Sequence, residues 1–229
     1  MRRTGLTRNA AWVMAITVLG TAAFLTTRYA SLPWLLPVHF RPDGIPNGWQ
    51  YKTFARVLLP VFIQLALALV LGGIGVLLLW RSDSRHEPGA PDVKAAATAG
   101  EAVVLIGLIW VAFQAYAAVA LVRTWTTARS GFGFGYLVFE AIGLILTAVI
   151  GVRAHVHLGR PEPRPYVPEH WRLGQLYRNA DDPALFVPTR DGSRWTINFG
   201  RPAAVALLGV VLAAGVIGPT IILILALRF

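Results

Sequence analysis

The stretch VLLPVFIQLALALVLGGIGVLLL, residues 57–79, decides the fold because it continues for 23 residues without a charged side chain. An α-helix rises about 1.5 Å per residue, so roughly 20 apolar residues cross a hydrocarbon core of about 30 Å. The stretch does not alternate between apolar and polar residues, which excludes the strands of a membrane barrel. It therefore predicts a transmembrane helix.

Four further stretches of the chain are also long and apolar enough to cross a membrane. The sequence is 55% hydrophobic and 14% charged, against about 25% charged residues in soluble domains. This excludes a soluble globular enzyme, and the absence of cysteine excludes a disulfide scaffold. We predict an all-α transmembrane bundle of five helices. The predicted spans are Ala10–Thr27, Val57–Leu79, Ala102–Val122, Phe132–Val152 and Ala203–Leu227.

The positive charges predict the orientation of these spans. With a cytoplasmic N-terminus, two thirds of the 21 Lys and Arg residues fall on the inner side, as the positive-inside rule requires. The net charge of +10 is then explained by topology and by attraction to anionic lipid headgroups, not by nucleic acid. A cleaved signal peptide is the alternative for the first span. We expect a multi-pass membrane protein with its N-terminus inside and its C-terminus outside.

The loops predict two ordered regions outside the spans. The outer loop, Arg28–Arg56, contains four prolines and two turn-forming pairs, Asp43-Gly44 and Asn47-Gly48. The cytoplasmic loop, Arg153–Arg201, carries two β-rich runs around Asp191-Gly192, a pattern that favours a β-hairpin. The short connection Asp83–Thr98 is rich in Pro, Gly and Ala, and we predict that it is flexible. The predicted hairpin precedes the last helix.

Polar residues within the spans are the first candidates for a site. Glu140 is the only charged residue inside a predicted span, and such residues usually face a bundle interior and mark function. Tyr136, one helical turn earlier, can donate to it. At about 1.5 Å per residue, one polar residue of each span lies roughly 9–12 Å below the outer surface. These residues are Thr21, Gln64, Gln114, Glu140 and Thr220. They form either a hydrogen-bonded layer that holds the helices together or a polar cavity that opens outward.

The outer loop supplies the second group of candidates. His39, Asp43 and Trp49 combine a titratable ring, a carboxylate and an aromatic surface, and we expect them to contact a ligand. The alternative, which composition alone favours, is that His39 donates to a loop carbonyl. His155 and His157 have no convincing acidic or thiolate partner, so the sequence predicts no metal site. No catalytic motif, nucleophile group or cofactor-binding motif is present, so no enzyme activity and no cofactor are predicted.

Two stretches resemble known bacterial domains. Leu32-Pro33, Leu36-Pro37-Val38-His39-Phe40 and Gly44-x-Pro46-Asn47-Gly48-Trp49-x-x-Lys52 resemble the N-terminal domain of SdpI-type immunity proteins, which protect cells from a secreted toxin and take part in membrane signalling. Arg41 departs from the Asn common in that family. Asp182-Pro183-x-Leu185-Phe186-Val187-Pro188 and Trp195-Thr196-Ile197-Asn198-Phe199-Gly200-Arg201-Pro202 resemble a second, uncharacterised domain.

The resemblance and the predicted spans together divide the chain into four parts: an SdpI-type membrane domain over residues 1–80, membrane helices over 81–152, a cytoplasmic loop over 153–202 and a final helix over 203–227. The ordered loop on each side of a helix bundle with a polar layer predicts a membrane protein that binds a peptide or protein ligand outside. The resemblance implies that this protein belongs to the bacterial plasma membrane and is concerned with immunity or signalling. The hairpin at 185–199 would meet a cytoplasmic partner. The alternative is a small transporter, or an accessory transport subunit, that uses Glu140.

Overall fold

The computed structural model describes residues 5–41, 43, 45–83, 91–128, 133–158 and 165–213. Within this part of the chain, four helices are long and apolar enough to cross a membrane, with mean hydropathies between 1.7 and 2.6. They coincide with the first four predicted spans. Of the fifth predicted span, only α6 (Pro202–Leu212) and residue 213 are described, and the remainder to Leu227, including Thr220, lies outside the described residues. The four helices are α1 (Gly5–Tyr29), α3 (Leu59–Asp83), α4 (Pro91–Thr127) and α5 (Gly133–Leu158).

Helix α4 begins earlier than the sequence predicted. Residues 91–98 are its first two turns, so the prediction of a flexible connection over Asp83–Thr98 was wrong for this part. The physical reason is that Pro91 suits the first position of a helix, where no intrahelical donor is needed. The three alanines at 95–97 then have the highest helix propensity of any residue.

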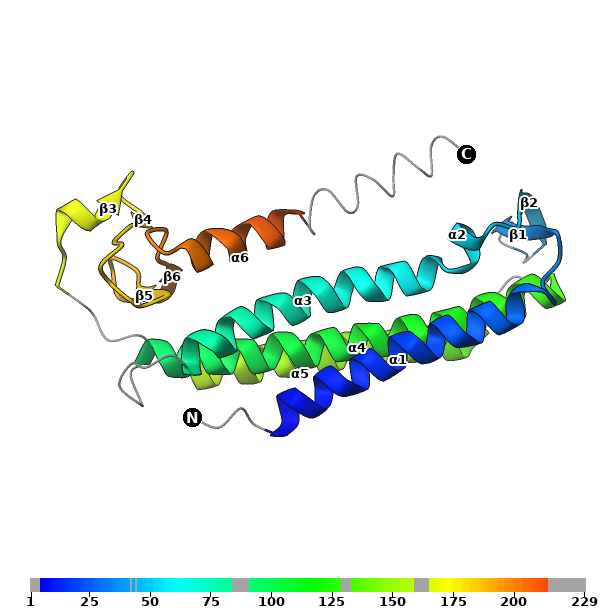
Figure 1. Ribbon diagram of the computed structural model, residues 1–229, viewed down its shortest axis with the longest axis horizontal. Coiled ribbons are helices and arrows are strands. Elements are labelled where there is room, and N and C mark those ends of the chain that lie inside the picture. Colours follow the sequence, from blue (N-terminus) through cyan, green and yellow to red (C-terminus); the bar gives the residue numbers. More distant parts are fainter. Residues whose placement is uncertain are drawn as a thin grey trace. The chain divides into compact units, whose positions relative to one another are not determined.

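The chain divides into two compact units. We call the first the bundle unit; it comprises residues 8–69 and 105–150, in which parts of α1, α3, α4 and α5 run side by side (Figure 1). The rings of Tyr116 on α4 and Phe139 on α5 stack at 4.8 Å between centroids. Where α5 passes Ile109, a Cβ on Gly143 would lie 3.6 Å from the isoleucine side chain, which is an ordinary van der Waals contact, so the two helices lie side by side there.

The bundle unit also contains a β-hairpin in the predicted outer loop. Strands β1 (Leu35–Phe40) and β2 (Pro46–Tyr51) pair antiparallel, and the one-turn helix α2 (Phe54–Val57) follows. The sequence predicted an ordered loop here and did not predict the strands. It also placed a tight turn at Asn47-Gly48, which was wrong, because both residues lie within β2.

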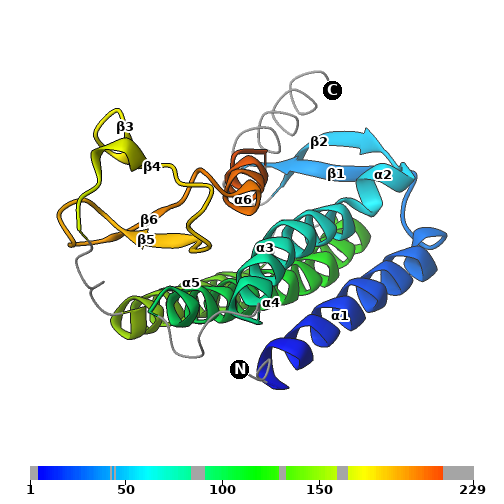
Figure 2. The same ribbon diagram turned by 60° about the vertical axis from the view of Figure 1, so that its left-hand side comes forward.

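We call the second unit the strand unit; its described part lies within residues 5–7, 70–104 and 151–213. Beyond α5, it contains the 3₁₀ turn η1 (Pro168–His170) and two antiparallel strand pairs, and Figure 2 shows these strands together, with α6 following β6. In the second pair, Phe186 lies opposite Ile197 and Pro188 opposite Trp195, so the predicted hairpin around Asp191-Gly192 is confirmed. The strands are β3 (Trp171–Arg172) with β4 (Leu176–Tyr177), and β5 (Phe186–Pro188) with β6 (Trp195–Ile197).

The core of the strand unit joins the second hairpin to the helices. Ile74 and Leu78 on α3 pack with Leu185, at the start of the hairpin, and with Ala204 on α6. All four are buried, and Ala204 has no exposed surface. Burial of such side chains contributes about 25 cal/mol per Å² of apolar surface removed from water. A two-stranded hairpin is marginal alone, so this packing contributes to the stability of the hairpin.

Candidate functional site

The β1–β2 hairpin is fixed at its base by Lys52. The Lys52 ammonium donates to the backbone oxygens of Tyr29, at 3.0 Å, and Leu32, at 2.8 Å, and lies 4.9 Å from the centre of the Tyr29 ring. Tyr29 is the last residue of α1, where free carbonyls and the helix dipole attract a cation. Leu32 and Leu36 are buried beside this contact. The hairpin is therefore tied to the end of α1 through both charge and packing.

His39 lies on β1 at a break in the strand register. Its Nδ1 donates to the side-chain oxygen of Asn47, a contact that the sequence did not predict. His39 is paired with Gly48, and the register shifts on both sides of the histidine. A Cβ on Gly48 would lie 2.8 Å from the His39 Cβ, so this position requires glycine.

Asp43 shapes the turn between the two strands. Its Oδ1 accepts a hydrogen bond from the backbone N–H of Ile45 at 3.0 Å, a local bond typical of aspartate in turns. The backbone N–H of Arg41 donates to the Ile45 oxygen at 2.9 Å and continues the ladder. Pro42 and Gly44 lie outside the described residues. The Asp43 carboxylate thus has a structural role in the loop.

One face of the hairpin is exposed and aromatic. Side chains alternate along β2, so Asn47, Trp49 and Tyr51 share the exposed face of the strand. Trp49 is 53% and Tyr51 63% exposed, and the Tyr51 ring meets the edge of Trp34, which is 69% exposed. His39 belongs to this face through its bond to Asn47. We call these five residues the hairpin face: Trp34, His39, Asn47, Trp49 and Tyr51.

Gln64 connects three helices within the bundle unit. Its side chain has no exposed surface. The Gln64 Nε2 donates to the hydroxyl oxygen of Thr21 on α1, at 3.1 Å, and to the backbone oxygen of Val111 on α4, at 2.9 Å. Within the described part of the chain, its Oε1 has no hydrogen-bond partner. The structure therefore brings together Thr21 and Gln64, two residues of the predicted polar layer. Their hydrogen bond is of the kind that holds membrane helices together.

Of the other predicted membrane residues, Tyr136 on α5 packs against α4. Gln114 and Glu140 are half-buried. The Tyr136 ring packs against Phe113, at 5.1 Å between centroids, and against Tyr116, at 6.5 Å. Among the described residues, no hydrogen bond joins Gln64 to Gln114 or Glu140. The predicted site is thus divided into the hairpin face, a buried amide between three helices, and an aromatic contact between two helices.

The turn of the second hairpin is closed by Asp191. Its carboxylate accepts hydrogen bonds from the hydroxyls of Ser193, at 2.5 Å, and Thr189, at 2.6 Å, and from the Ser193 backbone N–H, at 3.2 Å. These bonds, the Ser193 side chain first, lower the pKa of Asp191 to about 2. Because the pKa of Asp191 is lower in the folded chain, its carboxylate stabilises the turn at any pH above the ordinary pKa of an aspartate. This stabilisation is lost as the pH falls towards 2. Gly192, with φ of 67°, supplies the left-handed residue.

Asn198 is a structural centre that the sequence did not reveal as one. Its side chain has no exposed surface. The Nδ2 donates to the backbone oxygens of Asn179 (2.8 Å), Asp182 (3.1 Å) and Ala184 (3.1 Å). The Oδ1 accepts from the backbone N–H groups of Asn179 (3.1 Å) and Gly200 (2.9 Å). One amide thus satisfies the backbone of a loop that has no regular secondary structure.

The comparisons with known proteins point to the same segment. Residues 180–205 are similar to a family of unknown function (DUF5808). No curated protein and no solved structure matches the chain. The matched residues include β5, β6, Asn198 and the first residues of α6. The likeness therefore falls on the hairpin and on the hydrogen-bond network that holds it.

Proposed function

We propose that the chain is a non-enzymatic, multi-pass protein of the bacterial plasma membrane that binds a peptide or protein ligand with its hairpin face. The N-terminus is cytoplasmic and the β1–β2 hairpin lies outside, as the distribution of Lys and Arg favours. Ligand binding serves immunity or signalling of the SdpI type. This function rests on the resemblance of residues 32–52 to that family.

One observation supports the proposal above the others: the hairpin has a fixed base and an exposed aromatic face. Lys52 ties the base to α1, so the hairpin loses little conformational entropy on binding. The face offers Trp and Tyr rings, which are enriched at the centres of protein interfaces, beside a histidine. Trp49 is 53% exposed, so its substitution removes surface that a ligand can contact at a smaller loss of packing than for a buried tryptophan.

The orientation is tested by cysteine labelling, for which the natural chain is suited because it contains no cysteine. We expect Ile45→Cys, in the hairpin turn and 55% exposed, to react with a membrane-impermeant maleimide in intact cells. The matched variant Gln175→Cys, in the exposed turn between β3 and β4, should react only after the cells are permeabilised. Labelling of Gln175→Cys alone in intact cells would reverse the topology and remove the proposal.

The function is tested by survival of cells under a secreted toxin. We expect His39→Ala and Trp49→Ala, at equal expression, to lose at least tenfold in protection, because hot-spot aromatics contribute about 2 kcal/mol or more. The matched control is Leu69→Ala on α3, an apolar side chain that is 74% exposed and lies outside the hairpin. Protection that is unchanged in both hairpin variants contradicts the proposal.

Transport is the second candidate function, and the half-buried carboxyl of Glu140 on α5 favours it. An ionisable group within a membrane helix marks ion and proton pathways. A proton-coupled transporter should show pH-dependent flux in proteoliposomes that disappears in Glu140→Gln and persists in Trp49→Ala. A binding protein should show the opposite dependence on these two substitutions.

A further inference from the structure

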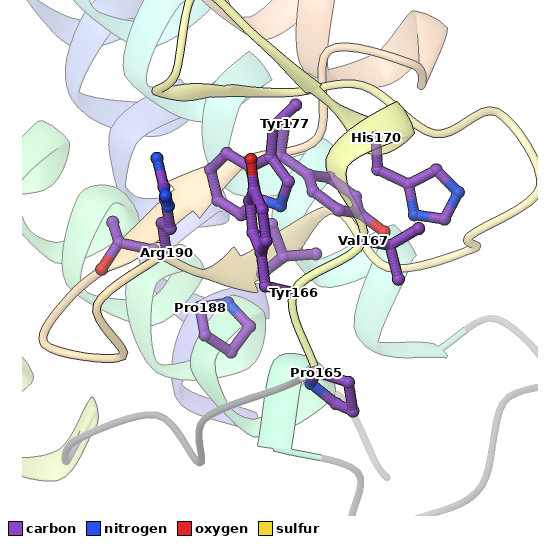
Figure 3. A pocket seen from close by; sticks show the side chains of 10 residues that line it. Pro165, Tyr166, Val167, His170, Tyr177, Pro188 and Arg190 are labelled. Atoms are coloured by element: carbon purple, nitrogen blue, oxygen red, sulfur yellow. The ribbon is translucent and has the colours of Figure 1, made fainter.

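The strand unit contains a pocket that belongs to neither predicted site. It has a volume of about 260 Å³ and lies between η1, the β3–β4 pair and the end of β5. Figure 3 shows its labelled side chains, with Tyr166 between Arg190 and His170. The volume is just below the range of about 300–1,000 Å³ that is usual for ligand sites. The pocket therefore suits a small molecule.

Aromatic rings form much of its wall, and their positions are fixed. Trp171 and Tyr177 meet edge to face at 5.3 Å between centroids, and Tyr166 lies 6.4 Å from Trp171. The Tyr177 hydroxyl donates to Asp182 at 2.9 Å, which fixes that ring from outside the pocket. Pairing of Trp171 with Tyr177 across β3 and β4 fixes both backbones. A flat apolar group would find a preformed surface here.

The charge of the pocket comes from Arg190. Its guanidinium lies 4.4 Å from the centre of the Tyr166 ring, held by a cation–π contact. Within the described part of the chain, this guanidinium has no hydrogen bond or ion pair, so its N–H groups are available to a ligand. The lining contains no aspartate or glutamate. A cationic ligand is therefore disfavoured. The Arg190 guanidinium already covers one face of the Tyr166 ring, and the lining has no acidic side chain to balance a second positive charge.

We propose that this pocket binds a small aromatic carboxylate, with its ring among Tyr166, Trp171 and Tyr177 and its carboxylate on Arg190. A guanidinium matches a carboxylate with two parallel N–H donors. One arginine balances the single negative charge of a carboxylate, whereas a phosphate dianion would need further donors. The proposal is independent of the hairpin face, since every lining residue lies in the strand unit.

The test uses the full chain in nanodiscs of neutral lipid and measures binding of 2-naphthoate by equilibrium dialysis. We expect saturable binding of 2-naphthoate and at least tenfold weaker binding of the neutral 2-naphthamide. Arg190→Gln should weaken 2-naphthoate binding about tenfold to a hundredfold, because this is the loss in affinity that corresponds to the free energy of a charge-assisted hydrogen bond. The same variant should bind the acid and the amide equally. Trp171→Leu should weaken both probes.

The matched control is Arg172→Gln, which removes an exposed arginine from β3 that does not line the pocket. It should bind 2-naphthoate as the natural chain does. Three results overturn the proposal: no saturable binding of the acid, equal binding of acid and amide by the natural chain, or equal loss in Arg172→Gln and Arg190→Gln. A melting temperature measured for each variant separates loss of the site from loss of the fold.

Discussion

Replacement of Asn198 by Leu should open the β5–β6 hairpin and lower its local stability by about 3 kcal/mol or more. Leucine has a similar volume, so the packing is largely kept, but the five hydrogen bonds of the amide are lost. The backbone oxygen of Ala184 would then lose this partner in a buried position, and the backbone N–H and oxygen of the half-buried Asn179 would lose theirs. Each such group costs about 1–3 kcal/mol.

Hydrogen exchange with mass spectrometry measures this change where it occurs. Peptides that cover residues 176–200 should exchange about a hundredfold faster or more in Asn198→Leu, since 1.4 kcal/mol corresponds to a factor of ten. Peptides from the bundle unit should exchange as before. The control is Gln175→Leu, which makes the same chemical change at an exposed turn position. Equal protection of residues 176–200 in Asn198→Leu and the natural chain would show that the network contributes nothing.

Much of the helical fold could be predicted because membrane helices follow from length and hydropathy alone. Val57–Leu79 is long and apolar enough to cross a bilayer whatever it packs against, and the structure has a continuous helix from Leu59 to Asp83. The β5–β6 hairpin was equally predictable, because Asp191-Gly192 supplies its own turn chemistry. In both cases the information is local.

The β1–β2 hairpin could not be predicted in the same way, because its cause is not local. Asn47-Gly48 has the composition of a turn, yet Gly48 is needed in β2 to admit His39 from the opposite strand. The fixed position of the hairpin depends on Lys52, which reaches the end of α1, more than 20 residues earlier in the chain. Tertiary contacts therefore outweigh the turn propensity of Asn47-Gly48.

The candidate site shows the same limit at the level of side chains. The depth argument placed Thr21 and Gln64 in one layer, and the structure joins them by a hydrogen bond. The depth of a residue could not show that Gln64 would also bond to the backbone of Val111, because the rotation of each helix about its axis is set by packing. Before the structure, Asn198 stood out only as one residue of a stretch that resembles a known domain. An asparagine beside a strand does not indicate which groups its amide will bond to.

Gly200→Ala should destabilise the same segment by about 3 kcal/mol or more, although it adds only a methyl group. The new Cβ would lie 2.5 Å from the backbone carbon and 2.6 Å from the backbone oxygen of Asn179, and 2.7 Å from the nitrogen of Ala180. Backbone atoms cannot turn aside as a flexible side chain can. The segment at Asn179 would have to move, and its oxygen would leave the amide of Asn198.

The matched control is Gly73→Ala on α3, where a Cβ would meet nothing within 4 Å. The same substitution there should raise helix stability by about 0.5–1 kcal/mol and leave exchange of residues 176–200 unchanged. Since Gly200→Ala and Asn198→Leu both act through Asn179, their combined cost should be well below the sum of the two, as expected for residues in one network. Additive costs, or a Gly200→Ala chain protected like the natural one, would mean that Asn179 is free to move and that the amide of Asn198 does not hold this segment.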